Sequence, residues 1–591
     1  MTRLPGAAAA LCSAAAMAAG GSPALLLHGG TIHTGNPAQP QAEAMLAIDG
    51  RIAYVGGEAE ARKRAPAGAR VVDLAGATVL PGLTDSHAHL SGIGWRELNF
   101  DLTGVESVEA LKRRLAERAA ADRAEWLVGI GWIESKWKPA VFPRRQDLDA
   151  VVSDRPVVLE RADGHAIVVN SKALEIAGIG RETPDPEGGQ ILREPATGEA
   201  TGMLIDAAMD LVRRHIPPST DAELGRALEA GAARSVRLGW TQLQDAGTSW
   251  REIEQLCRLY AAGKLKLRVY AAIGGPGEDA EKLLASGRGY RSCDSRLTVR
   301  AIKLYMDGAL GSRGAALDEP YSDDPVNRGL YVTPPAEILR IAVAGLRRGI
   351  QVETHAIGDR GNRVALDQYE RALAAVPVTE RPVADPRFRI EHAQVVAAAD
   401  MPRFAKLGVI ASMQTSHAIS DMLFAPARLG PARIAGAYAW RSMMDAGAKI
   451  AGGTDAPVEA GDPRVEFYAA IVRRTLEGFA GPDWGLDQVL TRDEALAILT
   501  ENAAYAAFQE KDRGSIEPGK LADFSVYSSD WMKVPAAEIP RSQPVMTVIG
   551  GEVVWQAQEG TVTFVKRGQS HLAQGSRHTF ATRSPNVTVP F

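Results

Sequence analysis

The middle of this 591-residue chain alternates short apolar runs with long helical stretches, and this rhythm constrains the fold more than any other feature. Helical patterns cover residues 105–121, 221–238, 335–348 and 493–507. Strands that alternate regularly with helices are typical of βα units around a parallel sheet. Strand-like patterns in this part of the chain fall at residues 78–83, 126–130, 157–159, 241–244, 267–272, 299–305, 351–354, 387–390, 409–413 and 449–452.

These ten runs exceed the eight strands of a (β/α)₈ barrel. The second and third runs fall in a stretch at about 125–216 whose Pro- and Gly-rich interior, residues 183–189, is unlike a barrel repeat. We therefore assign those two runs to an insertion after the first barrel strand. The remaining eight runs predict an α/β fold, a TIM barrel over residues 78–514.

The two ends of the chain have a different, β-rich pattern. Short apolar runs broken by glycine-containing turns lie between residues 25 and 74, and a similar patch returns at residues 522–555. Such runs are typical of antiparallel sheets. We expect residues 23–77 and 515–560 to build one composite β-sandwich domain, followed by a C-terminal tail at 561–591. The alternative is two unrelated β-patches.

Residues 1–19 resemble a secretory signal peptide: one Arg is followed by an Ala-rich, almost uncharged stretch with small residues before Ala19. Cleavage would make the protein periplasmic or secreted, without stable membrane insertion, and would leave Cys257 and Cys293, whose pairing the sequence does not reveal. An uncleaved Ala-rich leader would leave it cytoplasmic. The net charge of -4, with Lys and Arg spread along the chain, argues against nucleic acid as a partner.

A His-x-His pair, His87 and His89, follows the first predicted barrel strand. Residues i and i+2 of an extended backbone project to the same face, so both imidazoles can reach one metal ion. Two histidines on a solvated loop would look the same, so this pair alone is weak evidence.

Four further residues strengthen the metal interpretation, because each lies at or near the end of a separate predicted strand. Barrel enzymes place their chemistry at the C-terminal ends of their strands. Each could have a structural explanation taken alone, but their joint occurrence at one end of the barrel favours an active site. They are Lys303, His355, His392 and Asp455.

With these motifs the chain resembles the amidohydrolase superfamily, specifically its YtcJ-like and N-substituted-formamide-deformylase-like branch (amidohydrolase 3). The resemblance extends from Leu25 to Trp555. The motifs that carry it are His87-Ala88-His89, Gly164-His165, Val169-Asn170-Ser171, Thr197-Gly198-Glu199, Thr201-Gly202, Lys303 to Gly308, Leu310 to Arg313, Glu391-His392-Ala393-Gln394 and Thr454-Asp455-Ala456-Pro457.

The resemblance implies a metal-dependent hydrolase with one or two Zn²⁺ ions, or another divalent metal. His87, His89 and Asp455 would hold one ion, and His355 and His392 the second. Lys303, carboxylated by CO₂ to a carbamate, would bridge them, since a carbamate is an anionic oxygen ligand whereas an ammonium group cannot bind a cation. Thr454 stands where many relatives carry Ser.

The implied reaction is hydrolysis of a C–N bond, other than a peptide bond, in a small-molecule amide or formamide. A metal-activated water would attack the carbonyl, while Asp455 accepts its proton and then delivers it to the leaving nitrogen. The alternatives are a metal-assisted isomerase or lyase on the same scaffold, or a non-catalytic binding relic. Whether the chain forms a homo-oligomer stays open.

Four residues in segments expected at the barrel mouth are candidate substrate contacts. Arg313 could hold a carboxylate through two parallel hydrogen bonds. Each also has a structural alternative, such as packing for an indole or a loop hydrogen bond for a histidine. The candidates are Trp132, His165, Arg313 and His417.

Overall fold

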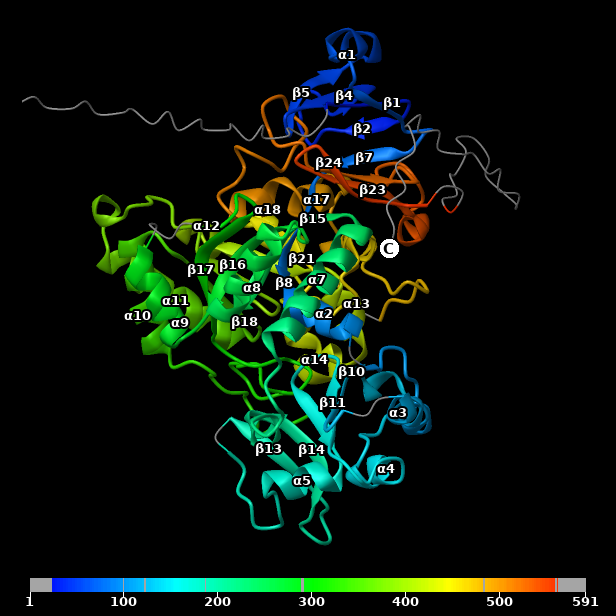
Figure 1. Cartoon of the computed structure of the whole chain (residues 1–591). Coiled ribbons are helices and arrows are strands. Elements are labelled where there is room, and N and C mark those ends of the chain that lie inside the picture. Colours follow the sequence, from blue (N-terminus) through cyan, green and yellow to red (C-terminus); the bar gives the residue numbers. More distant parts are fainter. Residues whose placement is uncertain are drawn as a thin grey trace, which may run out of the picture.

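The computed structural model describes residues 24–98, 100–121, 124–186, 188–287, 292–481, 484–558 and 561. An eight-stranded parallel sheet forms its centre (Figure 1). Neighbouring strands pair in the order β21-β20-β19-β18-β17-β16-β15-β8. Their bounds are β8 Leu83–Ala88, β15 Trp240–Thr248, β16 Arg268–Gly274, β17 Leu297–Tyr305, β18 Gln351–Ala356, β19 Arg389–His392, β20 Ile410–Gln414 and β21 Ile450–Gly453.

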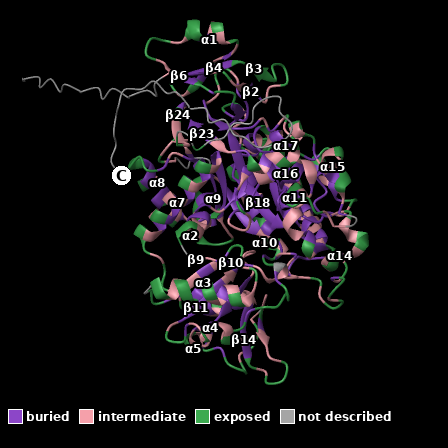
Figure 2. Cartoon of the chain, turned by 90° about the vertical axis from the view of Figure 1, so that its right-hand side faces the viewer, coloured by how far each residue is buried: buried purple, intermediate pink, exposed green. Residues whose placement is uncertain are grey.

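The first and last strands of this sheet meet and nearly close it into a barrel. The Asp455 amide donates to the His87 carbonyl at 2.7 Å, and Ala88 pairs with Ala456. Helices follow the strands on the outside, and the buried residues concentrate in the middle of the barrel (Figure 2). The predicted α/β barrel is therefore confirmed. The long outer helices are α7 Asp221–Leu238, α8 Trp250–Ala261, α10 Pro335–Arg348 and α11 Asp359–Ala375.

The expected first barrel strand, residues 78–83, is wrong. Strand β7, Thr78–Pro81, pairs instead with β2, Thr31–His33, and β22, Phe524–Tyr527, in a separate sheet, and the barrel strand begins at Leu83. Gly82 separates the two strands at a place without room for a side chain, because a Cβ there would lie 2.7 Å from Thr241 Oγ1 and 2.9 Å from Asp523 Cβ. One continuous apolar run therefore contributes strands to two different sheets.

Strands from both ends of the chain share one six-stranded sheet, ordered β24-β23-β22-β7-β2-β3. A four-stranded sheet, β5-β4-β1-β6, lies beside it, and one hydrophobic cluster takes side chains from both sheets. This part of the molecule covers the end of the barrel opposite the insertion (Figure 1). The strands are β1 Leu25–His28, β2 Thr31–His33, β3 Gln41–Ala42, β4 Ala44–Ile48, β5 Arg51–Gly56, β6 Arg70–Asp73, β22 Phe524–Tyr527, β23 Pro544–Ile549 and β24 Glu552–Gln556.

The insertion after β8 folds around its own six-stranded sheet, ordered β13-β14-β12-β11-β10-β9. This sheet includes β9, Phe100–Asp101, which precedes the expected start near residue 125. Separate hydrophobic clusters on its two faces give the insertion its own core. Its other elements are β10 Leu127–Trp132, β11 Val157–Arg161, β12 Ala166–Val169, β13 Gly189–Arg193, β14 Ala200–Asp206, α3 Val108–Ala121, α4 Arg145–Asp149 and α5 Ser171–Ala177.

Cys257 of α8 forms a disulfide with Cys293, a pairing that the sequence left open. The expected signal peptide, residues 1–19, and all of the expected tail except Thr561 lie outside the described residues. Among the described helices, none combines the length and apolar character needed to cross a bilayer.

Candidate metal centre

The predicted metal ligands converge at the C-terminal ends of the barrel strands. His87 is the penultimate residue of β8, His355 and His392 lie at the ends of β18 and β19, and Asp455 follows β21. One ligand atom from each of His87, His392 and Asp455 falls within 4.8 Å of the other two. These three residues are buried, and their ligand atoms lie close together, shielded from solvent.

Among the predicted ligands, Asp455 contacts both histidines of the His-x-His pair. Its Oδ1 is 3.1 Å from His89 Nε2 and 3.4 Å from His87 Nε2. Lys303 reaches the same place from β17, with its Nζ 3.5 Å from His87 Nε2. The barrel thus brings the His-x-His motif, the lysine and the strand-end aspartate together.

The other two histidines are adjacent, with the ring centroids of His355 and His392 4.5 Å apart. His392 Nδ1 is 2.8 Å from Gln414 Oε1, which orients that ring. The backbone at His392 and Asp455 is left-handed, with φ of 72° and 58°. Side chains rarely adopt this conformation, and such strain tends to accumulate where function requires a particular orientation.

The protonation states suit a cation. Burial holds the pKa of both His355 and His392 well below the ordinary value for an imidazole. The charge of Lys303 lowers the pKa of His355 further, and the neighbouring histidines lower that of His392. Burial raises the pKa of Asp455, but hydrogen bonds from His87 and His89 outweigh it and hold the pKa well below its usual range. Neutral imidazoles and an ionised carboxylate are the forms that bind a divalent metal, so these residues fit one.

A buried ion-pair network lies directly behind the cluster, and the sequence reasoning gave none of it a role. Glu391 Oε2 contacts His87 Nδ1 at 2.5 Å, and Arg389 Nε is 2.7 Å from Glu391 Oε1. Burial raises the pKa of Glu391, but Arg389 and His87 bring it down to about 2. A carboxylate on the far nitrogen of a ligand histidine fixes its tautomer and orientation. The Arg-x-Glu-His spacing at residues 389–392 is the sequence signal that could have identified this network.

A second buried acid, Asp307, lies near the next ligand. Its carboxylate accepts from the backbone amides of Ile357 and Gly358 and lies 3.6 Å from His355 Nε2. Burial raises the pKa of Asp307 to about 7, against the lowering effect of those amides. Its place four residues after Lys303, among glycines, was the sequence signal that could have identified it.

A cavity of about 1530 Å³ opens above the cluster, between the barrel mouth and the insertion. Two of the four candidate substrate contacts line it, His165 from the insertion and His417 from the helix after β20. His417 Nε2 lies 3.6 Å from Asp455 Oδ2 and has no hydrogen-bond partner among the described residues. Both histidines can therefore meet a ligand in the cavity.

The other two candidates lie elsewhere. Trp132 is fully buried in the core of the insertion, where its indole N–H donates to the Leu159 carbonyl at 2.9 Å. Arg313 forms an ion pair with Asp323, with 2.9 Å between Nη2 and Oδ2. Neither residue is among those that line the cavity.

Comparison with protein families matches residues 70–555 to the amidohydrolase family. The chain is 33% identical over 541 residues to YtcJ of Bacillus subtilis, covering 90% of this chain and 99% of that protein. It is 29% identical over 544 residues to the N-substituted formamide deformylase of Arthrobacter pascens, covering 89% and 97%. Among solved structures, an uncharacterized metal-dependent hydrolase from Pyrococcus horikoshii OT3 superposes with a TM-score of 0.71 at 29% identity, covering 87% of this chain and 99% of that one.

Proposed function

This chain belongs to the amidohydrolase family, and on that premise we propose that it is a metal-dependent hydrolase of an amide or formamide C–N bond. The observation that carries the proposal is the convergence of buried donor atoms from His87, His392 and Asp455 within 4.8 Å, at the floor of a large cavity. The choice of a C–N bond follows the relative named as an N-substituted formamide deformylase.

We infer that His87, His89 and Asp455 hold one divalent ion, with His355 and His392 available to a second. Zinc suits this set, because imidazole and carboxylate are among its ordinary ligands. A divalent ion held here would lower the pKa of a water molecule and polarise a carbonyl group. The carboxylate network of Glu391 and Asp307 behind the histidines supports this assignment.

Lys303 is proposed to carry a carbamate. Its Nζ would form a bond to the carbon of CO₂ and lose a proton, giving an anionic oxygen ligand between the two histidine groups. In the unmodified form the Lys303 Nζ is buried, 3.5 Å from an imidazole and 4.8 Å from the centre of the Tyr305 ring, and among the described residues no carboxylate lies within ion-pair distance of it. A buried charge without an opposite partner is costly, and a carbamate at this place would have its charge balanced by the cations that it would bind.

Asp455 is proposed as the general base. Its carboxylate is ionised and faces His89 and His417 at the cavity floor, where it can accept the proton of an attacking water. Such a group must lie within hydrogen-bond reach of the proton that it takes.

Two other functions remain as alternatives: a metal-assisted isomerase or lyase, and a binding protein without activity. A panel of N-acyl and N-formyl amines, incubated with zinc-loaded protein, distinguishes them. Stoichiometric release of a carboxylate and an amine supports hydrolysis. A product that keeps all atoms of the substrate, or no conversion of any compound by fully loaded protein, would contradict it.

We further propose that the chain is exported. The Ala-rich leader supports this, and so does the Cys257–Cys293 disulfide, because disulfides persist in oxidising compartments. Mass spectrometry of protein from the native host should give a mature terminus near Ala19 and a mass two hydrogens below the reduced chain. An intact Met1 or Thr2 terminus would contradict export.

A further inference from the structure

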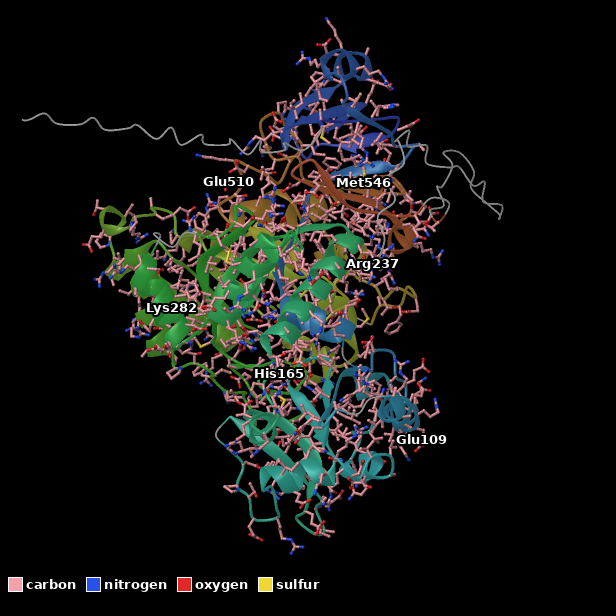
Figure 3. All side chains as sticks on the ribbon, viewed as in Figure 1. Glu109, His165, Arg237, Lys282, Glu510 and Met546 are labelled. Carbon is pink, nitrogen blue, oxygen red and sulfur yellow. A yellow bond between two sulfur atoms is a disulfide. The ribbon has the colours of Figure 1, made fainter. Side chains whose placement is uncertain are left out.

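The insertion contributes a histidine–aspartate pair to the cavity of the barrel. His165 follows the turn after β11, and its Nδ1 lies 2.7 Å from Oδ1 of Asp206 at the end of β14. Figure 3 shows His165 where the insertion meets the barrel. Within the described residues no hydrogen bond engages its Nε2, and the side chain is 27% exposed and lines the cavity. The imidazole is therefore held at one nitrogen and free at the other.

Asp206 is itself packed against the loop that leads to the metal cluster. A Cβ atom at Gly314 would lie 3.5 Å from Asp206 Oδ2 and 3.2 Å from the Cα of Gly308. The Gly308 carbonyl in turn lies 3.5 Å from Nε2 of His355. Glycines in this loop thus let the insertion approach the centre closely, with the loop between them.

The charges that face His165 come from three elements and favour its protonated form. Burial lowers its pKa, but the hydrogen bond to Asp206 and the charges of Asp163 and Asp455 raise it above the ordinary value. His355 and Asp307 also interact electrostatically with it, which places the imidazole near the cluster. Asp206 orients the ring, so a proton on Nε2 projects toward the cavity.

We infer that His165 is the general acid that protonates the leaving nitrogen. In this step the C–N bond breaks, its electron pair goes to nitrogen, and the Nε2 proton of His165 forms the new N–H bond. The neutral imidazole regains a proton from solvent at the cavity mouth. Asp455 remains the base that accepts the proton of the attacking water. This inference rests on the proposed hydrolysis of a C–N bond and assigns the insertion a catalytic role.

A leaving-group series tests the role. Two amides of one acyl group are compared, a 4-nitroanilide whose amine leaves readily and a benzylamide whose amine needs a proton. H165N should lower kcat/KM for the benzylamide by about 10²–10⁴-fold, and for the nitroanilide by less than about tenfold. H215N, which changes an exposed histidine of the same insertion, should match the wild type on both.

Metal content and pH dependence provide the readouts beyond turnover. Zinc per chain in H165N should equal the wild type by elemental analysis. For the wild-type benzylamide reaction, kcat/KM should fall at alkaline pH as His165 loses its proton. D206N, which keeps the histidine but removes the charge on its Nδ1 partner, should move that fall to lower pH. Because D206N retains the imidazole, it tests the inference even where H165N folds poorly.

The outcomes separate the two proposals. Equal losses of H165N on both amides, or an alkaline limb that D206N leaves in place, would overturn the role of His165 while the hydrolase function stands. A wild-type enzyme with full zinc content that cleaves neither these amides nor any of the broader panel would overturn the proposed function, and the acid role with it.

Discussion

The Asp85 carboxylate joins the first and last strands of the barrel by binding Thr454, whose hydroxyl donates at 2.6 Å and whose amide donates at 2.9 Å. The same carboxylate accepts from the backbone amide of His87 at 3.2 Å. Burial raises the pKa of Asp85 to about 7, against the lowering effect of the Thr454 hydrogen bonds. One buried side chain therefore fixes the segments that carry both His87 and Asp455.

Removing the Thr454 hydroxyl should loosen the metal centre. T454V keeps the shape of the side chain but leaves Asp85 without its shortest hydrogen bond, which costs about 1–3 kcal/mol when a buried acceptor loses its partner. T454S, which keeps the hydroxyl, is the matched control. We expect T454V to lose zinc faster than T454S during dialysis against a chelator. Equal rates of loss would show that this contact does not hold the centre.

Lys303→Ala should lower bound metal and activity together, because less negative charge would then separate two nearby cations. Added formate or acetate should restore part of the activity by occupying the vacated space. K303R should not respond to these anions, because the arginine fills the space and cannot be carboxylated. Full metal content and wild-type turnover in K303A would contradict the carbamate proposal.

Asp455→Asn should lose far more in kcat than in metal content. Asparagine tolerates the left-handed backbone at this position, where φ is 58°, so the fold should be retained. It lacks the basic oxygen, and loss of a general base costs about 10²–10⁴-fold. A D455N enzyme that keeps its metal and more than about a tenth of wild-type kcat would exclude Asp455 as the principal base.

Replacing both Cys257 and Cys293 with Ser should destabilise the barrel without changing the active site. The disulfide closes a loop across 36 positions of sequence, for which the loop-entropy relation predicts about 3–4 kcal/mol. The variant should unfold at lower denaturant concentration, while kcat/KM measured well below the transition should stay the same. An unchanged midpoint would show that the crosslink does not contribute to stability.

The sequence predicted the barrel and the convergence of the His-x-His pair, Lys303 and Asp455, because parallel strands bring their C-terminal ends to one place. It misplaced the first strand, since the apolar run around Gly82 carries no sign that its two halves enter different sheets. The two-residue strand Phe100–Asp101 is too short for a pattern to indicate.

The candidate substrate contacts were harder to place from the sequence, because their positions depend on which way an inserted domain faces. Trp132 ends a strand that borders the cavity, but its ring turns toward the core of the insertion. Asp206, the partner of His165, lies 41 positions away in sequence and meets it only after β12 and β14 pair. No local sequence pattern indicates this contact between distant residues.

The sheet shared by the two chain ends also affects how the protein is made. Thr78 pairs with Tyr527, and Pro81 with Phe524, so β7 leaves the ribosome long before one of its neighbours has been synthesised. Strand β7 must wait, with one edge unpaired, until residues 524–527 have been synthesised. Such distant pairing slows folding and exposes the waiting strand to wrong partners. The sheet that contains β7 is thus completed only after the barrel strands have been synthesised.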